Sequence, residues 1–199
     1  ADTKLLDWDA TVKVNLLPLL AKDGKSNHHL TTQLMFADHQ YSNNNTWFRP
    51  STSTIAINNG REGEASRSYS KERQQILEWL TNYNAEFNRH HVKVMAGYSY
   101  QYSNYSGFNA YNKDFPNDGL GADNIGSGEY AKEEGEICMG SYRNDSKLIA
   151  FFGRVSYDFA QKYMLTFSLR HEGSSKFGEN HKWGNFPAVS AGWRISDEK

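Results

Sequence analysis

The stretch from Leu148 to Arg170 reads LIAFFGRVSYDFAQKYMLTFSLR, and it decides the fold class. Alternate residues are apolar or aromatic, apart from Gly153, and most residues between them are polar or charged. This period of two predicts two strands, each greasy on one face and polar on the other. The break Ala160-Gln161-Lys162 predicts a tight turn between them. The open question is whether the greasy face touches a protein core or lipid.

The alternation recurs along the chain and predicts about seven strands in total. Segment 70–87 also has some helical periodicity, but strand is favoured because the next alternating segment is a natural pairing partner. Besides the opening pair, the expected strands cover residues 6–16, 30–41, 70–87, 92–103 and 189–195.

The connections between these strands alternate between short and long. Short breaks lie near residues 23, 89 and 161, and long polar stretches cover 42–68, 104–147 and 173–186. In an up-and-down antiparallel sheet, all short turns then fall at one rim and all long loops at the other. Outer-membrane barrels have this asymmetry, whereas a Greek-key sandwich has no reason for it. We therefore expect an all-β protein of antiparallel up-and-down strands, part of a large transmembrane β-barrel.

Composition agrees with one-sided strands separated by polar loops. Aromatic residues make up 14% of the chain, yet the chain is polar on average and its net charge is −1. That charge gives no reason to expect nucleic acid as a partner. No apolar run reaches the roughly 18 residues of a membrane helix, and the chain does not open on a signal peptide. A soluble or surface-attached all-β glycan-binding module stays open as the alternative.

The last fifty residues carry a family resemblance. The pieces FFGRVSYDF, KYMLTFSLRHEGSSKFG and KWGNFPAVSAGWRIS, with HHVKVMAGYSYQ and KDFPNDGL before them, resemble the SusC/RagA family of TonB-dependent outer-membrane transporters of Bacteroidota. The resemblance implies a barrel of about 22 strands, filled by a plug domain and covered by a SusD-like lipoprotein. No plug is recognisable in residues 1–199, so we expect an internal barrel segment of about seven strands.

The resemblance also implies a function and a set of partners. The whole protein would import oligosaccharide or peptide nutrients across the outer membrane together with the SusD-like lipoprotein. Energy would come from the TonB complex, through parts that this chain does not contain. No cofactor is implied.

The long stretch 104–147 has the composition of a ligand-binding loop, because its rings interleave with amides. Rings stack on sugar or peptide planes, and amides supply paired donors and acceptors. We expect an extracellular loop whose ligand-binding residues are Tyr105, Phe108, Tyr111, Phe115, Asn117 and Asp118. On the polar strand faces we expect Arg154, Asp158 and Arg170 to point into the barrel lumen.

Catalytic and metal chemistry find no support in the sequence. No Gly-x-Ser-x-Gly elbow places a nucleophile, so an enzyme is not expected. The pairs His28-His29 and His90-His91 are adjacent residues, which point to opposite faces of a strand and cannot easily share one metal ion. The single cysteine, Cys138, leaves no internal disulfide and is interpreted as a bystander.

Overall fold

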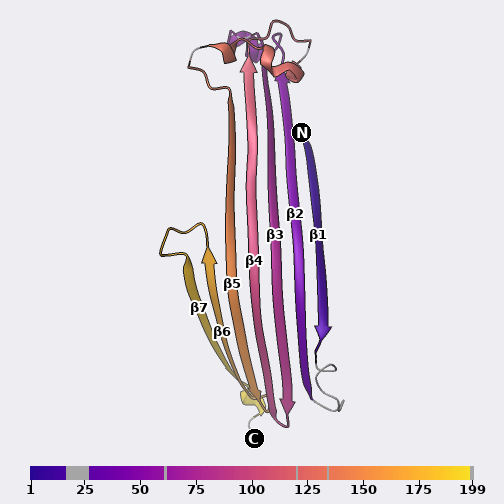
Figure 1. The fold of residues 1–199 in the computed structure, drawn as a ribbon, viewed down its shortest axis with the longest axis vertical. Helices are drawn as coiled ribbons and strands as arrows, with labels where there is room; N and C mark the ends of the chain where they lie inside the picture. Colours follow the sequence, from indigo (N-terminus) through magenta and orange to yellow (C-terminus); the bar gives the residue numbers. More distant parts are fainter. Residues whose placement is uncertain (17–26, 61, 120, 134, 198–199) are drawn as a thin grey trace. The chain divides into compact units, whose positions relative to one another are not determined.

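The described residues of the chain form one antiparallel sheet of seven strands, in the order β1-β2-β3-β4-β5-β6-β7 (Figure 1). The computed structural model describes residues 1–16, 27–60, 62–119, 121–133 and 135–197. The strands are β1 (Asp2–Asn15), β2 (His28–Arg49), β3 (Glu64–Phe87), β4 (His90–Lys113), β5 (Met139–Phe159), β6 (Tyr163–Ser174) and β7 (Trp183–Trp193). Short helices lie between and after them: α2 (Thr54–Asn58), η1 (Gly121–Ser127), η2 (Tyr130–Lys132) and η3 (Ile195–Asp197). No helix of the described residues is long and apolar enough to cross a membrane.

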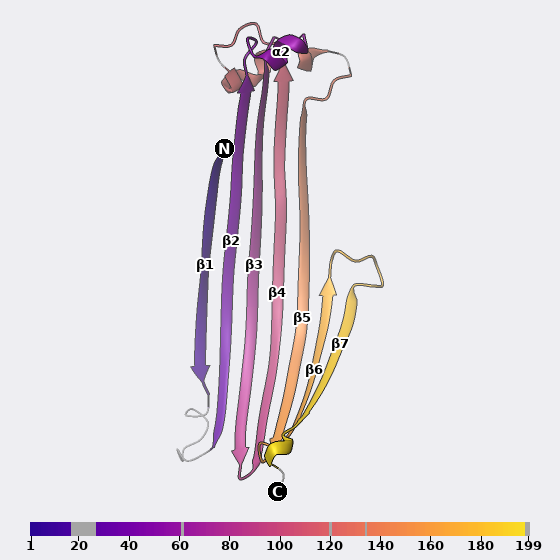
Figure 2. The ribbon, with the colours of Figure 1, turned by 180° about the vertical axis from the view of Figure 1, so that it is seen from behind.

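The expected all-β class and up-and-down topology are confirmed, because every strand pairs with its neighbours in sequence. The turns at Asn88–Arg89 and Ala160–Lys162 join β3 to β4 and β5 to β6 at one end of these strands (Figures 1 and 2). The β2–β3 and β4–β5 connections, which carry the short helices, lie at the other end. The turn expected near residue 23 falls outside the described residues.

The expected strand ends are wrong for all seven strands, each of which extends beyond its predicted bounds at one end or both, and most of all for β2, β4 and β5. The long connections shrink to residues 50–63, 114–138 and 175–182. The reason is physical: in residues 42–49, 103–113 and 139–147 both faces of the strand carry polar residues. Apolar alternation cannot mark a strand where neither face is apolar, although the backbone pairs in the same way.

Two faces of the sheet, named here A and B, follow from the pairing of side chains. The β5–β6–β7 register pairs Val155 with Phe167 and Phe167 with Val189, which defines face A. Arg154 pairs with Ser168 and Ser168 with Ala188 on face B. Ring contacts extend face A across the other strands: Tyr98–Phe151 (5.1 Å) to β4, His28–Tyr83 (5.9 Å) from β2 to β3, Tyr69–Phe108 (6.1 Å) from β3 to β4, and Trp8–Phe36 (5.3 Å) from β1 to β2.

The described chain divides into two compact units. Unit 1 contains residues 1–7, 39–73 and 103–145, and unit 2 contains residues 8–38, 74–102 and 146–199. The first five strands contribute to both units, whereas β6 and β7 belong to unit 2 alone.

Unit 1 has a small core of its own, built on face A by the loops. Ala65 of β3 is fully buried under Phe115 (3% exposed) and Ala122, with Phe48 and Ile125 packed around them. Asp118 holds the two loops together, because its carboxylate accepts hydrogen bonds from the Ser51 amide (3.0 Å) and the Ser51 hydroxyl (2.8 Å). Phe115 and Asp118, which the sequence predicts as ligand-binding residues, therefore stabilise the loops themselves.

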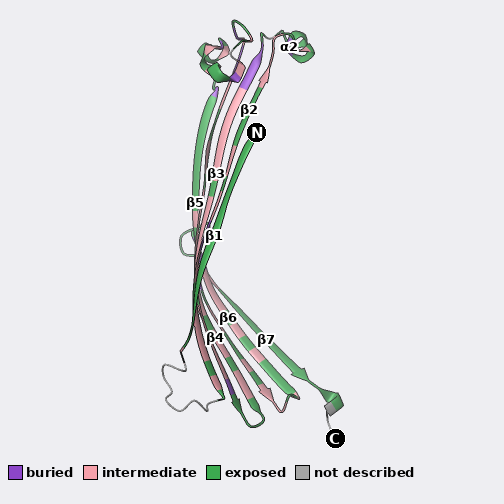
Figure 3. Cartoon of the chain, turned by 90° about the vertical axis from the view of Figure 1, so that its right-hand side faces the viewer, coloured by how far each residue is buried: buried purple, intermediate pink, exposed green. Residues whose placement is uncertain are grey.

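In the part of unit 2 that the structure describes, face A has no comparable core. Its apolar side chains are left open, with Leu165 51%, Phe167 46% and Val189 70% exposed. Along the edge strands β1 and β7 nearly every residue is exposed (Figure 3). A soluble sandwich needs a second sheet over such a face, and the described residues form one sheet only.

Candidate functional site

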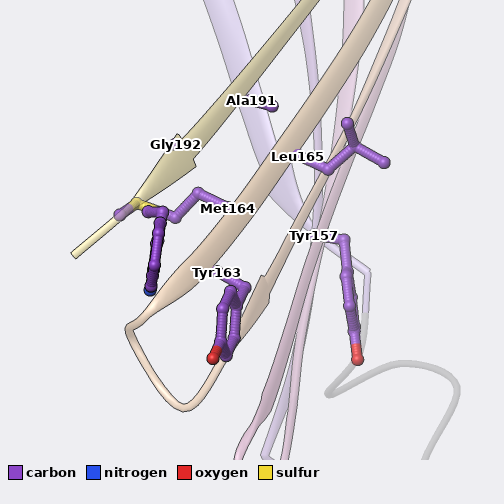
Figure 4. A pocket seen from close by; sticks show the side chains of 7 residues that line it. Tyr157, Tyr163, Met164, Leu165, Ala191 and Gly192 are labelled. Carbon is purple, nitrogen blue, oxygen red and sulfur yellow. The ribbon is translucent and has the colours of Figure 1, made fainter. Parts of the chain in front are cut away.

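An apolar hollow of 610 Å³ lies on unit 2 near the turn between β5 and β6. Its lining includes Tyr157, Tyr163, Leu165 and Trp193. Figure 4 shows the hydroxyl groups of Tyr157 and Tyr163 pointing toward the side of the turn. Tyr163 lies between Phe159 and Trp193 in a stacked row, with centroids 6.4 Å apart on each side. With few polar groups to orient a ligand, this hollow is a poor site for a small polar molecule. Tyr and Trp side chains whose polar groups point in one direction are typical of a membrane–water interface.

A different arrangement occupies face B of unit 1, where side chains from four segments form a ring cluster. Its members are Trp47 of β2, Tyr105 and Tyr111 of β4, Tyr130 of η2 and Tyr142 of β5. Tyr111 lies 6.4 Å from Trp47 and 6.4 Å from Tyr130, centroid to centroid, and Tyr105 lies 5.1 Å from Tyr142. Trp47, Tyr105 and Tyr142 keep 38–46% of their surface exposed. The cluster therefore offers ring surface to a ligand.

Two cations flank the ring cluster. The Arg49 guanidinium lies 5.4 Å from the Trp47 ring centroid, and the Lys113 ammonium lies 3.2 Å from that of Tyr130. Arg49 also donates to Glu64 at 2.6 Å, which fixes the guanidinium over the tryptophan. Tyr130 donates a hydrogen bond to Glu136, and this bond raises the pKa of Tyr130 to about 12. The hydrogen bond therefore extends the pH range over which the phenol stays neutral and remains a donor.

Backbone spacing separates the ring cluster into two patches along β4. Tyr105 and Tyr111 are six residues apart on the same face, so about 20 Å separates them along the strand. Gly107 and Asn109 occupy face B between them. A side chain at Gly107 would lie 2.5 Å from the Tyr142 hydroxyl oxygen, so glycine lets Tyr142 lie across β4. The arrangement suits an extended ligand with several stackable groups more than a single small ring.

The six predicted ligand residues do not form one site. The expected loop placement is wrong for Tyr105, Phe108 and Tyr111, because all three lie in β4. Tyr105 and Tyr111 share face B, whereas Phe108 lies on face A against Tyr69. Ligand contact by Tyr105 and Tyr111 stays a prediction, and their open ring neighbours are compatible with it.

The other three predicted residues have structural partners in the loop that follows β4. Phe115 is 3% exposed and packs against Phe48, with centroids 6.1 Å apart. Asp118 binds Ser51, and Asn117 accepts a hydrogen bond from the Gly119 amide at 3.0 Å, closing a turn. These contacts explain the residue types without a ligand.

Sequence reasoning missed Trp47, Tyr130 and Tyr142 as possible site residues, and it missed Asn112 as an organiser. The Asn112 amide donates to the carbonyl oxygens of Ile125 (2.8 Å) and Gly128 (2.9 Å), and its carbonyl accepts from the Ala131 amide (3.1 Å). The Asn112 side chain thus fixes the segment 125–131, which places Tyr130 in the ring cluster. The alternation of faces along β4 and β5 could have revealed part of the cluster. Continued beyond the apolar residues, it places Tyr105, Tyr111 and Tyr142 together on the face opposite the apolar one.

Arg154, Asp158 and Arg170 all lie on face B of unit 2, opposite the apolar side chains. Arg170 forms an ion pair with Glu172 and lies over the Phe152 ring at 5.6 Å. Asp158 accepts a hydrogen bond from the Gln161 amide at 2.9 Å, which caps the β5–β6 turn. Arg154 makes no ion pair or hydrogen bond with any residue in the part of the chain that the structure describes.

The histidine pairs point apart, as the strand geometry predicts. His28 contacts Tyr83 on face A, and His90 contacts Tyr157 on the same face, at 2.6 Å between the ring nitrogen and the hydroxyl. His91 lies on face B, 3.5 Å from Glu86. Among residues 1–16, 27–60, 62–119, 121–133 and 135–197, no three histidine, cysteine or acidic side chains converge as a metal site. Cys138 is buried and unpaired.

Comparison with known proteins identifies relatives for nearly the whole chain. The β-barrel family of TonB-dependent receptor-like proteins matches residues 6–198. TonB-dependent receptor P3 of Formosa agariphila is 33% identical over 153 residues, which are 76% of this chain and 14% of that protein. TonB-dependent receptor SusC of Bacteroides thetaiotaomicron is 38% identical over 58 residues, 29% of this chain and 6% of that protein. The chain thus spans a small part of the curated relatives that it matches.

A solved structure shares the fold. The RagAB peptide transporter structure superposes with a TM-score of 0.71 over 99% of this chain and 21% of that chain, at 15% identity. At such low identity the likeness shows the fold alone, which is that of a piece of a larger barrel.

Proposed function

The chain belongs to the TonB-dependent receptor β-barrel family, and we propose that it forms seven strands of the barrel of an outer-membrane importer. Face A of unit 2 lies against lipid, and face B lines the lumen. The imported nutrient is an oligosaccharide or a peptide, delivered with a SusD-like lipoprotein. The TonB complex supplies energy through parts of the protein outside this chain.

The observation that carries the proposal is the exposed apolar face A of unit 2. Leu165, Phe167 and Leu169 on β6 are 40–51% exposed, whereas Thr166 and Ser168 between them are more covered. A soluble protein would bury such a continuous apolar surface. In a membrane barrel, the lipid hydrocarbon covers these apolar side chains. The alternation along β6 is the one expected of barrel strands, which place apolar residues outward and polar residues inward.

Strand length supports the same placement. A strand needs about 9–11 residues to cross a bilayer when tilted. Unit 2 holds residues 28–38, 74–87, 90–102 and 146–159 of the long strands, which are 11 to 14 residues each. The strands β6 and β7 have 12 and 11 residues. Unit 2 therefore has the length of a membrane-spanning segment in every strand from β2 to β7.

A lumen-facing role for Arg154, Asp158 and Arg170 is supported by their place on face B. Charged side chains on this face would be solvated by the water of the lumen or paired with the plug, at little desolvation cost. Arg154, which has no partner among the described residues, is the strongest candidate to meet a group from outside this chain.

The ring cluster on unit 1 is the proposed contact for the nutrient. Tyr105 with Tyr142, and Tyr111 with Trp47, offer two stacking surfaces about 20 Å apart along β4. Sugar rings and peptide planes both stack on such rings, and Asn109 between them can bind hydroxyl or amide groups. A chain of several units can reach both patches, which favours an oligomer over a monomer.

Uptake by the full-length protein in its native host tests this function. Tyr111→Ala combined with Trp47→Ala removes stacking surface on face B, and uptake of the oligomeric nutrient should fall about tenfold or more. Phe108→Ala is the matched control, because it removes a ring from face A of the same strand. Equal loss in both variants would contradict a ligand path along face B, and wild-type uptake in the double variant would contradict the ring cluster as the contact.

A further inference from the structure

Face A of unit 1 carries a transverse row of side chains in which cations and hydroxyls alternate. The β1–β2 register that brings Thr3 to Asn43 and Asp7 to His39 also sets Lys4 opposite Ser42. Both have the parity of face A. The first pair of the row is therefore fixed by contacts on either side of it.

The other three strands continue this row. Between β2 and β3, Arg49 contacts Glu64 and Thr32 contacts Thr81, so both contacts have the same register. In this register Lys71 lies beside Ser42. The Tyr69–Phe108 ring contact sets Ser106 beside Lys71, and the approach of Gly107 to Tyr142 sets Arg143 beside Ser106. In order across the sheet, the row is Lys4, Ser42, Lys71, Ser106 and Arg143.

The cations of this row are separated by one intervening strand, so they lie about 10 Å apart. Lys4, Lys71 and Arg143 make no ion pair or hydrogen bond with any residue in the described part of the chain. By contrast, Arg67 on the same face has Asp123 at 3.9 Å. The row consists of side chains that the described chain leaves without counterions.

Charge is distributed unequally between the two faces of unit 1. Its strand residues carry five cations and two anions on face A (Lys4, Arg67, Lys71, Arg73 and Arg143; Asp2 and Asp145). Face B carries two cations and three anions (Arg49 and Lys113; Asp7, Glu64 and Glu72). A general need for solubility would not sort the signs by face.

On β4 the row lies beyond the last rings of the apolar part of face A, with Asn104 between them on that face. On β4, the last face-A rings of unit 2 are Tyr100 and Tyr102, and Ser106 comes four residues after Tyr102. Four residues span about 13 Å along a strand, or about 10 Å along the membrane normal at the usual tilt. The headgroup layer extends about 5–8 Å beyond the hydrocarbon, and Lys and Arg side chains reach down to it.

We propose that the row Lys4, Ser42, Lys71, Ser106 and Arg143 binds phosphate-bearing headgroups of lipids in the outer leaflet. The inference rests on the proposed placement of unit 2 in the bilayer. Ammonium and guanidinium groups bind phosphate oxygens with charge-assisted hydrogen bonds, and the neighbouring serine hydroxyls add donors. Such contacts would fix how deeply this side of the barrel sits in the membrane.

Lipid retention by the full-length protein tests the row. The probes are a bisphosphorylated glucosamine glycolipid and its dephosphorylated form, each in neutral micelles, with bound lipid counted by native mass spectrometry. The variant is Lys4→Gln/Lys71→Gln/Arg143→Gln. The matched control, Lys13→Gln/Lys93→Gln/Lys162→Gln, removes three charges away from the row. At about fivefold per charge, the first variant should bind the phosphorylated lipid about 100-fold more weakly, and the control should match wild type.

The outcomes separate the row from the function on which it rests. Quenching of tryptophan fluorescence by brominated lipid tails, measured in all three proteins, reports whether unit 2 inserts at all. If quenching is seen but the two variants bind the phosphorylated glycolipid equally well, the proposal for the row is wrong and the proposed importer function is unaffected. Absence of quenching would overturn the membrane placement itself. Displacement of the lipid by millimolar inorganic phosphate would show an anion site of low selectivity and would also overturn the proposal.

Discussion

Along the strands, face A is mostly apolar in unit 2 and mostly polar in unit 1, although five strands contribute to both units. On β3 it passes from Leu77 and Trp79 in unit 2 to Lys71 and Arg67 in unit 1. On β4 it passes from Val94 and Tyr98 to Ser106 and Asn112. The strands stay in one sheet on both sides of the change, so the two parts of face A differ in their side chains.

The two units also differ in how they bury apolar groups. Unit 1 has a core of its own beneath the loops, where Phe115 covers Ala65. Unit 2 leaves Phe167 and Val189 open on the same face. A surface that folding leaves uncovered must be covered by something else, and a bilayer provides this without further protein. The comparison therefore predicts that the same substitution changes stability by different amounts in the two units.

The largest effect is expected from Phe115→Ala in the core of unit 1. Truncation of a buried Phe costs about 3–5 kcal/mol, because the cavity left under the loops cannot fully collapse. Hydrogen exchange of the full-length protein should show residues 114–127 opening much more often, with unit 2 unchanged. Phe115→Leu should retain most of the protection. Equal protection in the Ala variant would mean that unit 1 has no core that stabilises it.

The next effect contrasts two phenylalanines on face A. Phe167→Arg in unit 2 should destabilise the barrel by about 2–4 kcal/mol if the side chain lies at the bilayer midplane. Phe108→Arg in unit 1 should change stability by less than about 1 kcal/mol, since water solvates that part of face A. Denaturant titration of the full-length protein folded into lipid vesicles measures both. Ser168→Asp, on face B beside Arg154, should be tolerated, and similar losses at positions 167 and 108 would break the comparison.

A smaller effect is expected where unit 1 depends on polar contacts. Asp118→Ala removes the acceptor of the Ser51 amide and hydroxyl, at a cost of about 1.5–3 kcal/mol. Asn117→Ala removes one exposed hydrogen bond from Gly119 and should cost about 0.5–1 kcal/mol. Proteolytic cleavage within residues 50–63 measures the release of the loop. The interpretation of Asp118 as a tether fails if both variants are cleaved at the same rate.

The smallest effect is a pH dependence that belongs to unit 1. The Tyr130 pKa of about 12 lies above the ordinary 10.0, because Tyr130 donates to the Glu136 carboxylate. The raised pKa stabilises the folded loop below pH 10, and this contribution is lost as the pH rises from about 10 to 12. Phenolate absorbance, compared between wild type and Tyr130→Phe, should give this midpoint. In a Glu136→Gln background the same difference should titrate nearer pH 10, and an unchanged midpoint would exclude Glu136 as the cause.

Prediction from sequence succeeded where one face of a strand is apolar and the other is polar. The alternation from Ile149 to Leu169 predicted the β5–β6 hairpin, its turn and its shared apolar face, all of which the register confirms. It failed at Tyr105, Phe108 and Tyr111, which continue β4 beyond the apolar region. Polar side chains on both faces look like a loop in sequence, because only the hydrogen bonds to neighbouring strands distinguish the two.

The candidate site was predicted only in part, for a related reason. Tyr105 and Tyr111 were recognised by type, but Trp47, Tyr130 and Tyr142 come from distant segments and meet them only through the sheet. Phe115 and Asp118 have the residue types of a binding loop and serve its internal packing instead. Residue type reports what a side chain is able to contact, and it does not report which partner is within reach.

The sequence by itself determined the all-β class, the up-and-down order and the greasy face of each strand in unit 2, because period-two alternation is a local property. It also determined the family, through motifs that stay in order along the chain. The tertiary structure alone decided where the strands end, which rings gather on face B, and that Lys4, Lys71 and Arg143 fall in one row. These depend on the register between strands, which is set by pairing between segments far apart in the chain.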